Sequence, residues 1–333
     1  MKQFVGMSYL SASRYFCLAL GAAMALLSAG CDSGSPPQIR IGYIPWPGYE
    51  PLALTEDLNY LKVDRYRFLN YTSSTQVLRA FRNNTIEVAA MTLDEAIELS
   101  KDMPDVRVVL VLDTSLGADV VLGRPGITNM ADLRGHRVAY EPTALGCFVL
   151  ARALESAGLK PKDVTLVASQ LDEHERVFLY AKMDAVVTFE PVRSRLLAKG
   201  ANILFSSAQI PGEIVDVLVM RQAFLRENSD AVKNILQAVF KAQVYQKISP
   251  DIANRYSCVR LGLSPEQLSN SYQLMTLVNL AENRRLLCGN PPALLESAKK
   301  LSAVMVGQGV LERSPDLSQL IDGSALEQIN LEK

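Results

Sequence analysis

The segment IRIGYIPWPGYEP, residues 39–51, decides how the beginning of the chain folds. Its first five residues alternate β-branched or aromatic side chains with Arg40 and Gly42, which predicts a strand. Two prolines and Gly48 then end the strand, because proline lacks the amide donor and glycine opens positive φ. From Glu50 onward the leucines follow helical spacing, so we expect strand, rigid turn, helix. In an open α/β sheet, such a turn lies at the carboxyl end of the strand, where ligands bind.

This turn carries the chain's sole tryptophan, Trp46, close to Tyr49. Aromatic faces suit flat or cationic ligands, so the two rings are candidates for a stacking wall. Alternatively, both rings close the end of a domain. The segment alone leaves both interpretations open.

Composition limits the classes of function. The chain has 333 residues, of which 49% are hydrophobic and 21% charged, as in a globular protein with room for two domains. A net charge of -1 gives no basic surface for nucleic acid, so we expect no nucleic-acid partner. No apolar run after residue 31 approaches the ~20 residues that span a bilayer.

The N-terminus resembles a bacterial lipoprotein signal peptide. A basic start precedes an apolar run over residues 15–27 and the small residues before Cys31. We expect residues 1–30 to be a cleaved signal, Cys31 to carry lipid such as palmitate, and residues 31–38 to form a tether. Asp32 resembles the mark for retention at the inner membrane, which places the protein on its periplasmic side. An ordinary cleaved signal with an incidental cysteine is the alternative.

Two further points stay open from the sequence. Translation can start at Met1 or at Met7, which would give a shorter signal. Three cysteines remain after the anchor, so Cys258 and Cys288 either pair or stay free with Cys147.

Alternating patterns predict an α/β architecture for the body of the chain. The expected strands after the first cover residues 66–71, 86–91, 106–112, 120–122, 136–140, 164–167, 185–188 and 203–205. Helical patterns separate the strands up to residue 112, which indicates a parallel sheet, and a second α/β unit begins further on. Only the small-residue segment 113–119 joins two neighbouring strands, as in a crossover from one lobe to another. Residues 213–220 lead back, and everything from Ala223 onward is helical in pattern.

Five motifs in order carry a resemblance to a known family. They are WPGYEPL (46–52), SLGAD (115–119), DLRGHRV (132–138), DAVVTFEP (184–191) and IPGEIVD (210–216). Over roughly residues 39–310 the chain resembles solute-binding proteins of nitrate/sulfonate/taurine-type ABC importers, whose relatives include binders of thiamine pyrimidine precursors. The resemblance implies an α/β, two-lobed periplasmic-binding-protein fold (type II) with two hinge crossings and a helical C-terminal part packed on lobe 1.

The same resemblance implies how the protein works. Lobe 1 would comprise residues 39–114 and 217–333, and lobe 2 residues 115–216, closing on the ligand as a clamp. The expected function is extracytoplasmic capture of a small polar molecule and its delivery, by a monomer, to ABC permease subunits. The alternative is a lipid-anchored sensor of the same fold that feeds a membrane signalling protein.

We expect neither catalysis nor a cofactor. The two histidines, His136 and His174, lack metal-ligand spacing, and no nucleophile elbow, P-loop or dinucleotide fingerprint is present. Metal sites are therefore not expected.

The resemblance places ligand contacts on turns at the carboxyl ends of strands in both lobes. The candidate residues are Trp46, Gly48, Tyr49, Thr92, Asp94, Ser115, Asp119, Glu141, Thr143 and Glu190. Local roles are the alternative: Thr92 and Thr143 cap helices, and Glu190 compensates a helix N-terminus. Asp119 and Asp216 would then hydrogen-bond the hinge backbone.

The charges at these turns predict the class of ligand. Asp94, Asp119, Glu141 and Glu190 lie there without a matching Lys, Arg or His. Like charges ~4 Å apart near a protein surface cost on the order of 4 kcal/mol, which disfavours an anion. We therefore expect an amine-bearing or heteroaromatic ligand rather than a sulfonate or nitrate.

Overall fold

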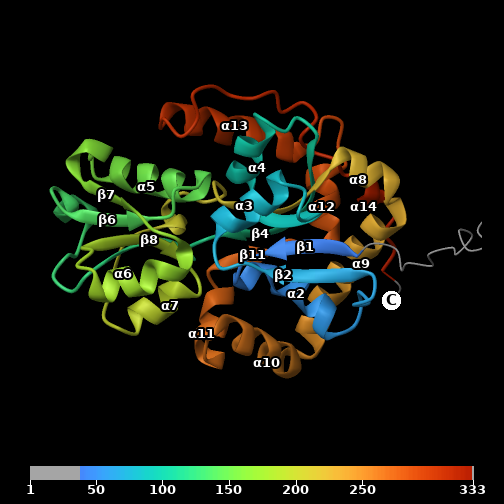
Figure 1. Ribbon diagram of the computed structural model, residues 1–333. Coiled ribbons are helices and arrows are strands. Elements are labelled where there is room, and N and C mark those ends of the chain that lie inside the picture. Colours follow the sequence, from blue (N-terminus) through green and yellow to red (C-terminus); the bar gives the residue numbers. More distant parts are fainter. Residues whose placement is uncertain (1–37, 332–333) are drawn as a thin grey trace, which may run out of the picture. The chain divides into compact units, whose positions relative to one another are not determined.

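The computed structural model describes residues 38–331, which form two lobes, each built around a mixed sheet (Figure 1). The expected signal peptide, the lipidation site Cys31 and most of the expected tether lie outside the described residues. No helix within residues 38–331 combines the length and apolarity that a membrane crossing requires.

The first sheet has six strands in the order β11-β4-β10-β3-β1-β2. They are β1 (Ile39–Tyr43), β2 (Tyr66–Asn70), β3 (Val88–Thr92), β4 (Val106–Ser115), β10 (Val215–Arg221) and β11 (Met275–Leu277). Strand β1 is parallel to β2 and β3, as the alternating pattern predicts. Strand β10 lies antiparallel between β3 and β4, so the sheet is mixed, although β1 to β4 run in one direction as the pattern over residues 39–112 predicts. The reason is that β10 returns from the other lobe and therefore enters the sheet in the opposite direction.

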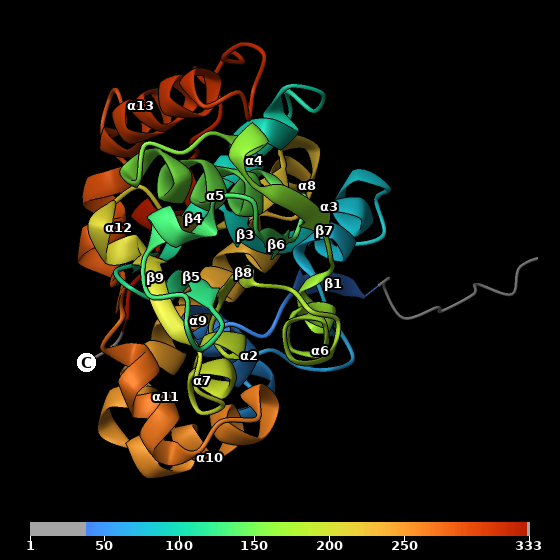
Figure 2. The ribbon, with the colours of Figure 1, turned by 90° about the vertical axis from the view of Figure 1, so that its left-hand side faces the viewer.

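The second sheet has five strands in the order β7-β6-β8-β5-β9 and faces the viewer in Figure 2. They are β5 (Asp119–Gly123), β6 (Arg137–Tyr140), β7 (Thr165–Ala168), β8 (Ala185–Phe189) and β9 (Asn202–Ser206). Strand β6 is parallel to β7 and β8, whereas β5 is antiparallel to β8 and β9. This sheet is therefore mixed for the same reason, because β5 is the strand that enters from the first lobe.

The chain passes between the sheets twice, from β4 to β5 and from β9 to β10. The two crossings contact each other: the hydroxyl oxygens of Ser115 and Ser207 are 2.8 Å apart, and the Gly117 amide donates to Ser207 Oγ at 2.6 Å. Gly117 has a φ of +120°, which side chains rarely allow. The expected two-crossing hinge is present.

Helices cover both sheets. They are α2 (Glu50–Asp57), α3 (Ser74–Arg82), α4 (Leu93–Ser100), α5 (Ala144–Ser156), α6 (His174–Tyr180), α7 (Val192–Leu197), α8 (Gln222–Glu227), α9 (Ser229–Ile248), α10 (Pro250–Leu261), α11 (Pro265–Tyr272), α12 (Leu280–Leu287), α13 (Ala293–Gly307) and α14 (Ser324–Glu327). In the second lobe α5 lies on one side of the sheet and α6 and α7 on the other (Figure 1). Helices α8 to α14 belong to the first lobe, as expected for the C-terminal part.

The C-terminal part is not wholly helical, which corrects the expectation for residues after Ala223. Strand β11 pairs antiparallel with the last residues of β4, from Asp113 to Ser115. Without β11, this edge of β4 would be unpaired. Strand β11 supplies hydrogen-bond partners for the backbone groups of β4 there. The thiols of Cys147, Cys258 and Cys288 are all free, so the structure contains no Cys258–Cys288 disulfide.

Candidate functional site

Two narrow cavities of about 10 Å³ each lie next to each other, the first between the lobes and the second within the second lobe. That volume holds about one water molecule. The first is lined by Ile44, Trp46, Tyr49, Ser74, Thr92, Glu95, Asp119, Leu145, Phe189 and Asp216. The second is lined by Asp119, Glu141, Thr143, Leu145, Gly146, Val149, His174, Val187, Thr188 and Phe189. Asp119, Leu145 and Phe189 line both, so the cavities adjoin, and we call them together the interlobe site.

Aromatic rings from both lobes meet at the first cavity. Trp46 lies in the turn after β1, and its ring meets Phe189 at the end of β8 edge-on, with centroids 5.7 Å apart. Tyr49 meets the same indole with centroids 6.5 Å apart. Trp46 and Tyr49 are each only 3% exposed. Because Trp46 touches the opposite lobe, it is placed to respond to the separation of the lobes.

Each of these rings from the turn binds a buried carboxylate. Trp46 Nε1 donates to Asp113 Oδ2 at 3.0 Å, and the Tyr49 hydroxyl donates to Asp216 Oδ1 at 2.5 Å. Asp113 and Asp216 are paired across the antiparallel strands β4 and β10. Gly48 makes this approach possible, because a Cβ there would lie 1.8 Å from Asp113 Oδ2. The turn therefore holds two rings over two carboxylates, with glycine required between them.

Two more carboxylates lie beside this pair. Asp119 opens β5 and is 2% exposed, and its Oδ2 has no hydrogen-bond partner among the described residues. Burial raises the pKa of Asp119 to about 7. Glu95, in the first turn of α4, accepts from the Thr92 amide at 3.2 Å, and burial raises its pKa as well. The Thr92 hydroxyl has no described partner and lines the same cavity.

The site is acidic throughout. Six carboxyl groups at most 3% exposed gather around it: Asp94, Glu95, Asp113, Asp119, Glu141 and Asp216. Burial raises the pKa of every one of them. The linings of both cavities contain no Lys or Arg. Their one histidine, His174, is buried, which lowers its pKa to about 4, so it is neutral at pH 7. Protonation or a bound cation must balance these charges.

Glu141 joins the lobes rather than facing open space. Its Oε1 accepts from the Thr75 amide at 2.9 Å and from the Thr75 hydroxyl at 2.7 Å, at the start of α3. Nearby, Ser73 Oγ donates to Gln170 Oε1 at 2.8 Å. On the side of α13, Gln308 donates to Glu155 at 2.9 Å. The two lobes are in the closed arrangement.

The structure brings together six of the ten residues expected to touch ligand. Those that line the cavities are Trp46, Tyr49, Thr92, Asp119, Glu141 and Thr143. Thr143 also caps α5, because its hydroxyl accepts from the Gly146 amide at 3.3 Å.

The other four expected residues line neither cavity. Gly48 packs on Asp113, and Ser115 joins the hinge crossings as described above. Asp94 is buried in the first turn of α4. Glu190 accepts from the Arg193 guanidinium at 3.0 Å and from Ser194 Oγ at 2.9 Å, so its partners lie in the first turn of α7.

Sequence analysis missed Asp113, Glu95 and Phe189 as site residues and gave Asp216 only a hinge role. A signal existed for Asp113, which is a lone carboxylate that directly follows the apolar run 106–112. Its pairing with Asp216 depends on the antiparallel insertion of β10, which the sequence pattern does not reveal.

Solved structures share this fold. The alkanesulfonate-binding protein SsuA from Xanthomonas axonopodis pv. citri, bound to MOPS, superposes with a TM-score of 0.72 at 15% identity, covering 87% of this chain and 100% of that one. The ligand-binding component of an ABC-type import system from Staphylococcus aureus, with zinc bound, gives 0.71 at 13% identity and coverages of 88% and 99%. The desulfurization enzyme DszB gives 0.63 at 17% identity and coverages of 87% and 98%. The chain thus has the periplasmic-binding-protein fold, which binding proteins and an enzyme share.

The relatives found by sequence match a smaller part of the chain. Proteins of Brucella abortus and Brucella suis, provisionally named binding proteins, are 23% identical over 147 residues, which is 43% of this chain and 46% of each relative. The chain thus matches about half the length of these curated relatives. The NMT1-like family model matches residues 32–261. This range includes the turn with Trp46 and both crossings between the lobes. The chain therefore belongs to the NMT1-like family.

Proposed function

We propose that this protein is the solute-binding component of an ABC importer, and that its ligand is a small amine-bearing or protonated heteroaromatic molecule. The observation that carries the proposal is the group of buried carboxylates between the lobes, with aromatic rings beside it and no cationic side chain in the lining. A cation bound there gains direct attraction from Asp119 and its neighbours, and the rings of Trp46 and Tyr49 offer cation–π faces.

The names of the structural neighbours refer to sulfonates, but the chemistry of this site differs from what an anion needs. An anion requires donors or positive charge, as at a free helix N-terminus. Here the first turn of α4 already carries Asp94 and Glu95. A sulfonate would add a further negative charge to a site where burial already opposes ionisation. We therefore place anions outside the ligand class.

Binding accounts for the site better than catalysis does. A cysteine nucleophile needs a lowered thiol pKa, whereas burial raises the pKa of the Cys147 thiol in α5. His174 bonds Thr188 Oγ1 at 3.1 Å and the Ser169 carbonyl at 3.3 Å, and burial lowers its pKa to about 4, which makes it a weak base for activating that hydroxyl. The chain shares its fold with the enzyme DszB, but a shared fold does not supply an activated nucleophile or a base.

The proposed mechanism is closure of two lobes, residues 39–114 with 217–333 and residues 115–216, around the ligand. In the closed arrangement the cavities hold about one water each, so a larger ligand enters after the lobes separate at the two crossings. The closed surface is what the permease would recognise. We place the protein on the periplasmic side of the inner membrane, anchored by lipid on Cys31.

A thermal-shift screen tests the ligand class. Small amines and aminopyrimidines should raise Tm, and alkyl sulfonates and nitrate should not. Asp119→Asn should reduce the shift, whereas Glu190→Gln should leave it intact, because Glu190 lines neither cavity. Stabilisation by micromolar sulfonate, retained in Asp119→Asn, would refute the proposed ligand class.

A cellular experiment tests the transport role. Deleting the protein should abolish uptake of the ligand found in the screen. A lost response to that ligand with unchanged uptake would instead support the sensor alternative.

A further inference from the structure

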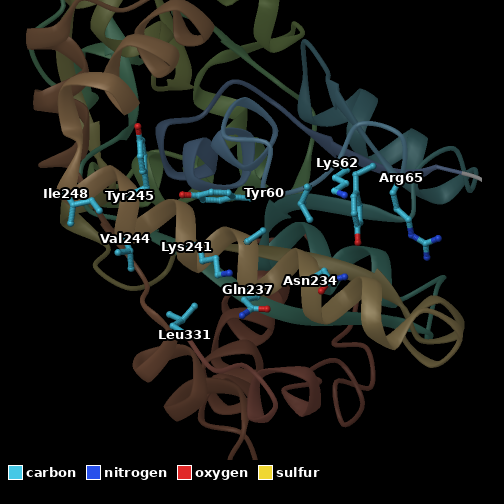
Figure 3. Close-up of a pocket in the computed structure, with 13 residues that line it drawn as sticks. Tyr60, Lys62, Arg65, Asn234, Gln237, Lys241, Val244, Tyr245, Ile248 and Leu331 are labelled. Carbon is cyan, nitrogen blue, oxygen red and sulfur yellow. The ribbon is translucent and has the colours of Figure 1, made fainter. Parts of the chain in front are cut away.

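A second, larger hollow lies on the outer side of the first lobe, away from the hinge. It is a groove of about 750 Å³ between α9 and the segment 60–66 that leads into β2. Its lining is Tyr60, Leu61, Lys62, Arg65, Tyr66, Asn234, Gln237, Ala238, Lys241, Val244, Tyr245, Ile248 and Leu331. Figure 3 shows Lys241 and Gln237 on α9 facing the segment that carries Tyr60 and Lys62. We call this hollow the basic groove.

The basic groove has the opposite charge from the interlobe site. Lys62, Arg65 and Lys241 line it, and no Asp or Glu does. None of these three cations forms an ion pair with a residue in the described part of the chain. Three unneutralised cations in one groove favour an anionic partner.

The rim of the groove is unusually apolar for a charged surface. Ile248 is 72% exposed, and Val244, one turn before it on α9, is 48% exposed. Cations beside exposed aliphatic and tyrosine side chains match a membrane interface, where headgroups meet acyl chains.

The groove also lies where the chain emerges from the expected tether. The Gln38 side chain donates to the Val63 carbonyl at 2.5 Å, and the Ile39 amide donates to the Arg65 carbonyl at 2.8 Å. Gln38 lies seven positions after Cys31 in the sequence. Seven residues span at most roughly 25 Å when fully extended. A lipid on Cys31 would therefore hold this face, rather than the second lobe, close to the bilayer.

We propose that the basic groove docks on the headgroups of anionic phospholipids and fixes the orientation of the protein on the membrane. The phosphodiester of the headgroup binds the three cations, and the side chains of Val244 and Ile248 enter the interface. This inference rests on the anchor of the proposed function but not on its ligand class. Tethering would make a weak contact effective, because it raises the local concentration of lipid.

Fluorescence quenching by brominated lipids tests the docking. The full chain is purified with its anchor and reconstituted into vesicles in which either the neutral phosphatidylcholine or the anionic phosphatidylglycerol carries the bromine. Ile248→Trp adds a reporter at the groove rim, and Ile203→Trp adds a matched reporter on β9, where Ile203 is 44% exposed. We expect quenching of the reporter at position 248 only, and only with the anionic lipid.

Charge variants locate the interaction. Replacing Lys62, Arg65 and Lys241 together by Gln should reduce the quenched fraction at least about tenfold. The matched control replaces the exposed Lys160, Lys162 and Lys199 of the second lobe by Gln and should change nothing. Binding of the cation from the thermal-shift screen should be equal in both triple variants, so a failure of the ligand proposal remains distinguishable.

Several outcomes would overturn the docking. Equal quenching at positions 203 and 248, or quenching that persists without the three cations, would remove the groove from the contact. No quenching in any vesicle would point to an acidic protein partner instead. Displacement by millimolar glycerol phosphate would identify a site for small soluble phosphates. If the chain carries no lipid, docking is tested by flotation of the unanchored protein with the same vesicles. The two triple variants are compared in the same way.

Discussion

The interlobe site and the basic groove handle charge in opposite ways. In the interlobe site, Asp119 and its acidic neighbours are buried and lack cationic partners, and burial raises their pKa values. In the basic groove, Lys62 and Lys241 are exposed and stay hydrated. The chain as a whole has a net charge of only -1, so the two regions concentrate charges of opposite sign within a nearly neutral protein.

The difference shows what burial does to a charged group. A buried carboxylate is poorly solvated, so it either binds a proton or binds a cation, and its state depends on pH. An exposed lysine keeps its charge between pH 5 and 8, but salt screens it. The interlobe site should therefore respond to pH, and the basic groove to salt.

The largest expected effect is the pH dependence of ligand binding. Asp119 has a pKa of about 7 in the folded protein. A group with that pKa is only about 1% ionised at pH 5, so cation affinity should fall about 100-fold from pH 8 to pH 5. Isothermal titration should also show proton release on binding near pH 6.5. Vesicle binding by the basic groove should hardly change over this range, and a parallel loss of both would contradict the comparison.

The same group makes the stability of the free protein change in the opposite direction. The pKa of Asp119 is raised from 3.8 to about 7, so between these values the folded state keeps a proton that the unfolded state has lost. Its contribution to the free energy of unfolding therefore decreases as pH rises from about 4 to about 7. Denaturant unfolding without ligand should show greater stability at pH 5 than at pH 8.

The second largest effect is that of Asp119→Asn. Losing one charged hydrogen-bond partner should weaken cation binding by about tenfold or more and flatten the pH dependence. At pH 8 the free protein should become more stable, because a buried charge is removed. Glu312→Gln is the control, since Glu312 is exposed and lines neither cavity. A variant that binds as tightly as the wild type would exclude Asp119 from the ligand's contacts.

The sequence predicted most of the architecture because local patterns encode it. The strand, turn and helix over residues 39–51 and the crossing at 113–119 are found where the sequence places them. The antiparallel insertion of β10 was not predictable, because strand direction within a sheet depends on tertiary pairing. For the same reason, sequence analysis did not bring Asp113 and Asp216 together.

The site residues show the same limit. Glu190 follows a strand like the other candidates, yet the nearby Arg193 and Ser194 bind its carboxylate. A turn sequence indicates where a carboxylate lies along the chain, but not which partner it finds. The raised pKa values likewise depend on burial between lobes, which no single segment encodes.

A third, smaller effect is the salt dependence of binding, which should differ between the two regions. Raising ionic strength from about 0.05 M to about 0.5 M shortens the screening length to a few ångströms, so vesicle binding by the basic groove should fall about tenfold. Ligand affinity should change less than about threefold, because the interlobe site is closed to ions from solvent. Flotation assays and isothermal titration measure the two responses on one preparation. Equal salt dependence would mean that the interlobe charges are solvated when ligand binds.

The smallest expected effect isolates lobe closure from ligand charge. Thr75→Val removes the hydroxyl that donates to Glu141 at 2.7 Å but keeps the amide bond to the same oxygen. Losing one such hydrogen bond costs about 1 kcal/mol, so the closed state should become about fivefold less favoured. Ligand affinity should weaken by up to about that factor, and small-angle scattering should show a larger radius of gyration below saturation.

The matched control for Thr75→Val is Gln308→Ala, which removes the exposed contact to Glu155. Exposed polar contacts of this kind contribute little, so affinity and radius of gyration should stay near the wild-type values. The Thr75 contact should matter more because Glu141 is 3% exposed and would lose one of the two donors to its Oε1. If both variants behave alike, Glu141 does not hold the lobes together, and its carboxylate would be free to bind ligand with Asp119.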